Sequence, residues 1–202
     1  MPIRTIAGLF AAILCTLALA HASTVTVTPN DRIMGSVLAP VTVVEYASPS
    51  CPHCAHFNAD IFPLLKRGYI ERGKVLYVFR VFPRQPVDGA AEGLARCLPP
   101  KQYFAAMDLL FRNQNVWDPA LGVADPRAGL ESIAGHLGLD AKRADACMSD
   151  QTVAQRTNAE AADAVAHYGI RGTPTFVING IVQPAGVIPW PQMQQIIDRL
   201  AP

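Results

Sequence analysis

The sequence predicts an α/β fold in which a βαβ half and a ββα half are separated by an all-helical insertion. Two strand-like segments, Val41 to Ala47 and Lys74 to Phe82, enclose a segment with helical periodicity. Near the end of the chain, Asn179-Gly180 separates two short strand-like runs and suits a two-residue hairpin turn, because both positions tolerate positive φ. The stretch between the two halves has helical patterning throughout.

The βαβ half is built around the strand expected at Val41–Ala47, which is rich in β-branched residues. The alternating segment TVTVT at residues 24–28 is expected to be an edge strand. After Cys51, apolar residues recur at helical spacing to about Lys66, and Pro63 is expected to kink this helix. Because strand, helix and strand follow one another, the two strands should be parallel and joined by a right-handed crossover.

The ββα half contains TFVI at residues 175–178 and IVQ at residues 181–183, on either side of the expected turn. A helix follows, whose apolar residues share one face: Trp190, Met193, Ile197 and Leu200. Pro191 is tolerable in the first turn of that helix.

Three apolar stripes at helical spacing predict helices in the insertion, and such stripes are more typical of a packed core than of a ligand site. They consist of Tyr103, Met107, Leu110 and Phe111, then Leu130, Ile133, Ala134 and Leu137, then Ala154, Thr157, Ala161, Val165 and Tyr168. Gly138 and Gly169 are expected to end the second and third helices.

The first residues have the pattern of an export signal, in which Arg4 is the only early charge and an apolar run extends from Thr5 to Ala20. This run is shorter than the roughly 20 residues that span a bilayer, so cleavage near Ala22 is favoured over a retained anchor. We therefore divide the chain into a signal peptide, a first α/β part, a helical insertion and a second α/β part, at residues 1–22, 23–86, 87–169 and 170–202.

The composition excludes some classes of function and permits another. The chain has 17 basic and 16 acidic residues, a balance that does not support binding to nucleic acid or to an anionic membrane. Beyond the signal it keeps an even number of cysteines, Cys51, Cys54, Cys97 and Cys147. Disulfide chemistry is permitted outside the cytosol. A monomer is expected.

The segment SPSCPHCAHF, from Ser48 to Phe57, holds the main candidate for chemistry. At a helix N-terminus, free N–H groups and the helix dipole stabilise a Cys51 thiolate, and a protonated His53 would add to this. Haem attachment requires a histidine directly after the second cysteine, where this chain has Ala55. Zinc needs two further ligands, and no second Cys-x-x-Cys or paired histidine motif is present, so no metal is expected and a metal-binding module is a remote alternative.

These features together resemble the thioredoxin fold. Pro52-His53 between the cysteines, with helices between the two halves, resembles the DsbA-like thiol:disulfide oxidoreductases of the bacterial periplasm. The likeness extends from about Asp31 to Leu200 and includes the distant segment Gly172-Thr173-Pro174-Thr175. The motif alone is a weak signal, but its combination with the preceding strand, the following helix, the distant Thr-Pro and an export signal is strong.

The resemblance implies a periplasmic enzyme that donates a Cys51–Cys54 disulfide to exported proteins with reduced cysteines, by way of a mixed disulfide at Cys51. Cys54 would be the resolving thiol, and the Pro52-His53 dipeptide favours oxidation over the alternatives of a reductase or a disulfide isomerase. The resemblance implies no cofactor besides the redox-active disulfide. It also implies a quinone-linked membrane partner of the DsbB type that reoxidises the enzyme.

The resemblance further assigns roles to three residues around the cysteine pair. Pro174 is expected to be cis and to lie beside the pair, and Thr173 and Pro174 are expected to hold client main chains by hydrogen bonds. Glu45, six residues before Cys51, occupies the place of the family's buried acid and would relay a proton to the pair. Alternation along the strand leaves open whether Glu45 instead reaches solvent.

The second cysteine pair, Cys97 and Cys147, lies in the helical insertion. In an oxidising compartment a structural disulfide is favoured over two reduced thiols. Closing a loop of about fifty residues would contribute up to roughly 4 kcal/mol in the chain-entropy model.

Overall fold

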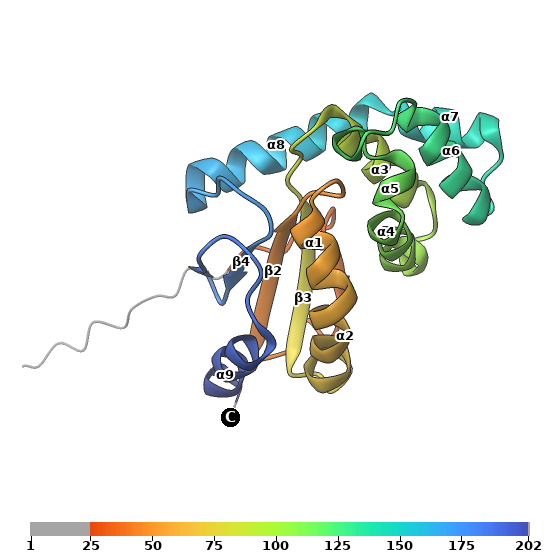
Figure 1. Ribbon diagram of the computed structural model, residues 1–202. Helices are drawn as coiled ribbons and strands as arrows, with labels where there is room; N and C mark the ends of the chain where they lie inside the picture. The colour runs from red at the N-terminus through yellow and green to blue at the C-terminus, as the bar shows by residue number, and fades with distance from the viewer. Residues whose placement is uncertain (1–24, 202) are drawn as a thin grey trace, which may run out of the picture.

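The computed structural model describes residues 25–201, so the predicted signal peptide at residues 1–22 lies outside the described part of the chain. A five-stranded mixed sheet with strand order β1-β3-β2-β4-β5 forms the centre of the molecule (Figure 1). Among the helices within residues 25–201, none is both long and apolar enough to cross a membrane.

The strands follow the predicted halves closely. Their bounds are β1 Arg32–Met34, β2 Val41–Ala47, β3 Val75–Val81, β4 Thr175–Ile178 and β5 Ile181–Val182. β2 and β3 are parallel, as the βαβ pattern predicted, and β4 pairs antiparallel with both β2 and β5. The hairpin turn has φ of 45° at Asn179 and 80° at Gly180, which confirms the positive φ that favoured this dipeptide.

The edge strand expected at residues 24–28 is not a strand in its described part, residues 25–28. The edge strand is instead β1, which pairs antiparallel with β3. Val25 is buried against a face of the sheet, and Thr28 donates its backbone N–H and hydroxyl to the Asp31 carboxylate in a tight turn. The alternating apolar residues of this segment are therefore used for packing over the sheet, which the sequence pattern does not distinguish from strand pairing.

The helical segment after Cys51 continues to Ile70, beyond the end expected near Lys66. It consists of α1 Pro52–His56, the π-helical turn η1 Phe57–Ile61, α2 Phe62–Leu65 and the π-helical turn η2 Lys66–Ile70. Pro63 has no N–H to donate and its ring crowds the preceding turn, which accounts for the wider π turn directly before it.

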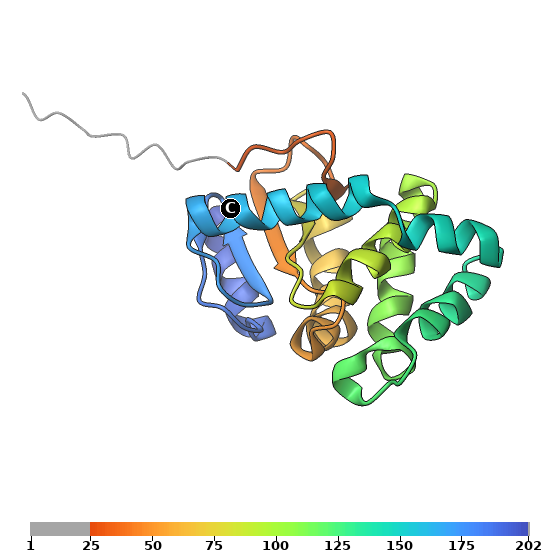
Figure 2. The same ribbon diagram turned by 90° about the horizontal axis from the view of Figure 1, so that it is seen from above.

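Helices cover both faces of the sheet (Figures 1 and 2). The segment from α1 to η2 and the C-terminal helix α9, Trp190–Leu200, pack on one face, where Val43, Phe176 and Met193 are buried together. Helix α8, Gln151–Tyr168, crosses the other face, where Val44, Val78 and Ala164 form a second apolar cluster. Both faces of β2 are therefore buried, and so is every residue of this strand from Val43 onward.

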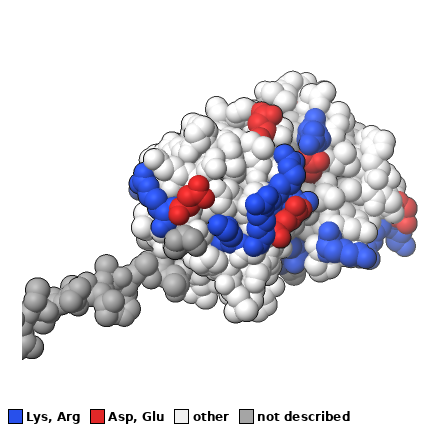
Figure 3. All heavy atoms as spheres, turned by 90° about the horizontal axis from the view of Figure 1, so that it is seen from below, with Lys and Arg blue, Asp and Glu red and all other residues white. Residues whose placement is uncertain are grey.

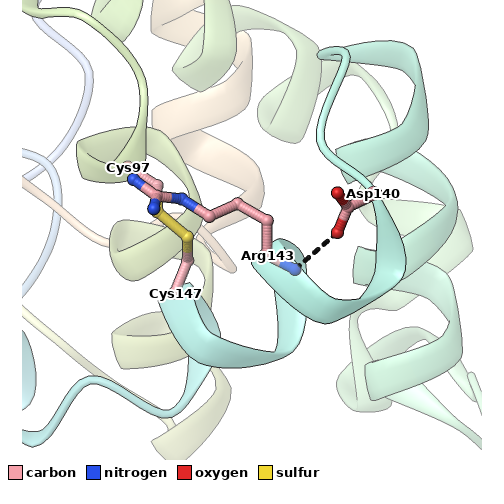
Figure 4. The surroundings of a disulfide bond; sticks show 4 residues. All are labelled: Cys97, Asp140, Arg143 and Cys147. Atoms are coloured by element: carbon pink, nitrogen blue, oxygen red, sulfur yellow. Dashed lines mark hydrogen bonds between the residues drawn. A yellow bond between two sulfur atoms is a disulfide. The ribbon is translucent and has the colours of Figure 1, made fainter.

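The segment between β3 and β4 is helical, as predicted. Besides α8 it contains α3 Pro86–Cys97, η3 Pro100–Gln102, α4 Tyr103–Arg112, α5 Gln114–Trp117, η4 Pro119–Leu121, α6 Pro126–His136 and α7 Ala141–Met148. The disulfide between Cys97 and Cys147, which was a prediction, joins the end of α3 to α7 (Figure 4). These helices approach closely, because a Cβ on Gly93 would lie 2.2 Å from the carbonyl oxygen of Cys147.

The stripe predicted for α4 is buried, as are Leu130, Ile133 and Ala134 of α6. Leu137, the last residue of the second stripe, follows α6 and is only partly buried. The stripe predicted for α8 is wrong in part. Val165 is 40% exposed, whereas Val153, Thr157 and Ala164 are buried. The buried face is thus rotated by about one residue from the predicted stripe. Helix α8 is rich in alanine, so its sequence contains too little contrast in side-chain size to show which face packs on the sheet.

A candidate dithiol site at the start of α1

Cys51 and Cys54 lie where the central strand β2 leads into α1. Cys51 is the N-cap residue and Pro52 occupies the first turn, a position where a missing N–H costs nothing. Both cysteines are buried and carry free thiols. The neighbouring Pro52 and His53 are exposed, so the first turn of α1 borders the solvent.

The loop before β4 brings a distant part of the sequence to the cysteine pair. The Cys51 thiol donates a hydrogen bond to the carbonyl oxygen of Thr173, with a distance of 3.3 Å between Sγ and O. The peptide bond between Thr173 and Pro174 is cis, as the resemblance implied. The Thr173 hydroxyl is buried and has no hydrogen-bond partner among the described residues.

The two thiols differ strongly in acidity. The hydrogen bond from Cys54 is the main cause that lowers the pKa of Cys51 to about 5. The backbone N–H groups of Cys54 and His53 act in the same direction, and burial opposes them. Burial is the main cause that raises the pKa of Cys54 well above that of an ordinary thiol. The hydrogen bond to Cys51 and the charge of an ionised Glu45 raise it further. At neutral pH the site therefore holds a thiolate at Cys51 and a protonated thiol at Cys54.

Glu45 is 2% exposed and lies in the central strand, opposite Phe79 of β3 and Phe176 of β4. This burial decides the question that strand alternation left open. The Tyr77 hydroxyl donates a hydrogen bond to the Glu45 carboxylate. Burial, opposed in part by this hydrogen bond, raises the pKa of Glu45 to about 8. A carboxyl group that keeps its proton at neutral pH thus lies near the thiols, and when it ionises its charge raises the pKa of Cys54.

The helical insertion holds the loop before Cys51 through a buried carboxylate that the sequence analysis missed. Asp88 of α3 is fully buried and accepts hydrogen bonds from the Ser48 hydroxyl, at 2.9 Å, and from the Ser50 N–H, at 2.8 Å. Its carboxylate also accepts the N–H groups of Arg84 and Gln85, which precede α3. The pattern Gln85-Pro86-x-Asp88 could have signalled a helix start, although nothing in it indicates contact with the cysteine loop.

A second contact from the insertion reaches the same loop. The buried side chain of Gln114, in α5, donates from Nε2 to the carbonyl oxygens of Pro49, at 2.7 Å, and Cys51, at 3.1 Å. The position of Cys51 therefore depends on the packing of the insertion against the sheet. No sequence signal marks Gln114, because a glutamine in a helix is most often a solvated residue.

The site has no arrangement typical of a metal centre. Within residues 25–201, no group of three or more histidine, cysteine, aspartate and glutamate side chains is placed to hold a metal ion. Of the residues predicted for the site, the structure brings together Glu45, Cys51, Cys54, Thr173 and Pro174, with Pro52 and His53 at the rim. It places Cys97 and Cys147 together in the insertion, as a disulfide.

Comparisons with known proteins agree with this geometry. A family model described as thioredoxin matches residues 27–199. The crystal structure of alpha-DsbA1 from Wolbachia pipientis is 28% identical, with a TM-score of 0.80, and the match covers 88% of this chain and 94% of that one. The crystal structure of a protein-disulfide isomerase from Novosphingobium aromaticivorans is 27% identical, with a TM-score of 0.74, covering 85% of this chain and 98% of that one.

The chain also matches a protein of Rickettsia bellii named "Putative protein-disulfide oxidoreductase", with 33% identity over 154 residues. The match covers 75% of this chain and 58% of that relative. A second relative, from Rickettsia typhi, is 31% identical and is covered over 56% of its length. The chain therefore spans little more than half the length of these curated relatives.

Proposed function

The chain belongs to the thioredoxin family, and on that premise we propose that it is a protein thiol:disulfide oxidoreductase acting through Cys51 and Cys54. The observation that carries the proposal is the contrast between the two thiols, with the pKa of Cys51 lowered to about 5 and that of Cys54 raised. The names of the relatives and the structural neighbours support the same reaction class.

The favoured direction is oxidation of client proteins. A client thiolate attacks Sγ of Cys51 in the Cys51–Cys54 disulfide, forming a mixed disulfide and releasing the sulfur of Cys54. A second client thiolate then attacks the client sulfur of the mixed disulfide and releases Cys51 as a thiolate. The client loses two electrons and the enzyme gains them. A stabilised thiolate at Cys51 makes the reduced enzyme the lower-energy product, so the disulfide is readily donated.

Glu45 has the properties that the release of Cys54 requires. The sulfur of Cys54 is released into a buried site where its thiolate is unfavourable, so the step is favoured by a nearby proton donor. With a pKa raised to about 8, Glu45 carries that proton at neutral pH. Tyr77 holds the carboxyl group in place by its hydrogen bond and is a positioning residue in this scheme.

The loop at Thr173 and Pro174 is proposed to bind the client main chain. Pro174 has no N–H and leaves room for an extended segment beside Thr173. Pro52 and His53 form the exposed rim of the cysteine pair and would meet the client first.

The cellular setting completes the proposal. We place the enzyme in the periplasm, with cleavage near Ala22, clients that are exported proteins with reduced cysteines, and a quinone-linked membrane protein that reoxidises it. N-terminal sequencing of the protein recovered from the periplasm should begin at Ser23. Recovery of the uncleaved chain in the membrane fraction would contradict this placement.

The direction is tested by equilibrating the mature protein with glutathione redox buffers at neutral pH and measuring the fraction of the Cys51–Cys54 pair that is reduced. A variant with Cys97→Ser and Cys147→Ser controls for the second pair. An oxidant keeps its active pair reduced until the buffer is strongly oxidising. A pair that remains a disulfide in reducing buffer would contradict the oxidase direction and favour a reductase.

A disulfide isomerase is the second candidate, because one solved neighbour is named a protein-disulfide isomerase. Reactivation of a client with scrambled disulfides separates the two. An isomerase with a reduced active pair restores the scrambled client without a net oxidant. The oxidase proposed here restores only a client whose cysteines are reduced, and only when the Cys51–Cys54 pair is a disulfide.

A further inference from the structure

A pocket of about 740 Å³ lies beside the cysteine pair and is not used by the chemistry described above. It is lined by four separate parts of the chain: the start of α1, the approach to α3, the η4 turn and the loop before β4. Thr173, the proposed contact of the client main chain, forms part of its wall, together with Pro52 and His53. A client held at Thr173 would therefore place the residues beside its cysteine in this pocket.

The charges that line the pocket and face solvent are positive. Arg84 and Arg171 are both exposed, and neither guanidinium forms an ion pair or a hydrogen bond with another residue in the described range 25–201. The one acidic residue in the wall, Asp118, is 1% exposed. Its carboxylate is occupied by hydrogen bonds from Gln85 Nε2 and the Ala120 N–H, at 3.1 and 2.9 Å. The two arginines are thus free to bind a carboxylate from another molecule.

A second basic pocket, between α2 and α4, differs in that some of its cations have carboxylate partners. Its cations are partly neutralised by carboxylates of the same pocket, since Lys66 lies 3.8 Å from Glu71 and Arg112 pairs with Asp108 at 2.9 Å. On the face seen from below, Lys and Arg side chains likewise have Asp and Glu beside them (Figure 3). The pocket that holds Arg84 and Arg171 differs from the one between α2 and α4 in that its wall includes Pro52, the residue next to Cys51.

The pocket also offers an apolar contact. Leu121 of the η4 turn is 54% exposed and lies in the same wall. A segment that places a carboxylate between the arginines could cover this side chain as well, and burial of exposed leucine surface favours binding.

We propose that this pocket selects client segments that carry Asp or Glu next to the reactive cysteine, through Arg84 and Arg171. This inference rests on the proposed function and names the class of client that the site prefers. The reaction itself is unchanged: the client dithiol becomes a disulfide and the Cys51–Cys54 disulfide becomes two thiols. Arginine suits this role because its planar guanidinium binds a carboxylate through two parallel hydrogen bonds.

The experiment compares three short dithiol peptides that differ only in the residues flanking the first cysteine, which are Glu, Gln or Lys. The oxidised mature protein is mixed with each peptide at low ionic strength, and the second-order rate constant of peptide oxidation is measured. Because flanking charge also changes the acidity of the peptide thiol, each rate is divided by the rate of the same peptide with glutathione disulfide. The variants are Arg84→Gln with Arg171→Gln, and the control is Arg199→Gln, an exposed arginine on α9.

We expect the normalised rate to be about tenfold higher for the Glu peptide than for the Lys peptide, because exposed charge pairs each contribute only modestly to binding. This ratio should fall towards one in the double variant and in high salt, and should persist in Arg199→Gln. A wild-type ratio of one, or a ratio that survives the double substitution, would overturn the proposed selection. A wild-type protein that oxidises none of the peptides would overturn the proposed function itself.

Discussion

Replacing Glu45 by glutamine should make the protein more stable at neutral pH while making it a slower oxidant. Glutamine has nearly the same volume, and its amide oxygen can accept the hydrogen bond that the Tyr77 hydroxyl donates to Glu45. The substitution therefore removes the titratable group with little change in packing. Its effect on the free energy of unfolding should depend on pH.

The magnitude follows from the shift of the Glu45 pKa, from an ordinary value of 4.5 to about 8 in the folded protein. The folded state holds this proton more tightly than the unfolded chain does. The stabilisation that this proton gives the folded state is therefore fully present below the unfolded pKa, and it is lost as the pH rises towards the folded pKa. Between about pH 5 and pH 7 the loss amounts to about 2.5 kcal/mol, at about 1.36 kcal/mol per pH unit where only the unfolded chain has lost the proton.

The assay is equilibrium unfolding in guanidinium chloride at several pH values, with both disulfides intact so that no cysteine titrates. Burial, the main cause of the Glu45 shift, does not depend on the redox state of the thiols. Glu45→Gln should gain stability relative to wild type by about 2.5 kcal/mol more at pH 7 than at pH 5. Glu131→Gln, which removes a partly exposed carboxyl group on α6, is the matched control.

A stability difference between Glu45→Gln and wild type that stays constant across this pH range would refute the assignment of a buried, protonated carboxyl group. In the redox assay, the same substitution should slow formation of the mixed disulfide at neutral pH, because the departing Cys54 sulfur loses its proton donor. An unchanged rate would leave Glu45 as a structural acid only.

Three further predictions concern the thiols and the insertion. The thiolate absorbance of the reduced protein should titrate with a midpoint of about pH 5, and this titration should vanish in Cys51→Ser. Because folding lowers the pKa of Cys51, its ionisation stabilises the reduced folded protein at high pH, and this stabilisation is lost as the pH falls through the folded pKa. Gln114→Ala should lower the free energy of unfolding by about 1–3 kcal/mol, since the Pro49 and Cys51 carbonyls lose their donor, and Gln114→Glu, which supplies none, should not restore it. Joint replacement of Cys97 and Cys147 by serine should cost about 4 kcal/mol in denaturant unfolding, as expected for a crosslink between residues 50 apart, and a loss below about 1 kcal/mol would contradict the chain-entropy account.

Local patterns in the sequence were sufficient for the two halves of the fold, with the parallel pair of β2 and β3 in one and the hairpin of β4 and β5 in the other. The β-branched run at Val41–Ala47, the Asn179-Gly180 turn and the apolar face of α9 each depend on residues close together in the chain. The errors occurred where the same local pattern fits two arrangements. Residues 25–28 alternate like a strand but pack over the sheet, and the alanine-rich α8 has no distinct apolar face by which to orient it.

The sequence by itself marked the Cys51-x-x-Cys54 motif and the second cysteine pair, because cysteines are few in this chain, and the family resemblance marked Pro174. Only the tertiary structure decided the pKa values of Glu45, Cys51 and Cys54 and the contacts that shift them. The pKa of Glu45 depends on its position in the central strand with both sheet faces covered. Asp88 and Gln114 reach the cysteine loop only because the insertion packs there, across separations of 38 and 63 residues or more. Burial and long-range hydrogen bonds are properties of the packed chain, so no local pattern encodes them.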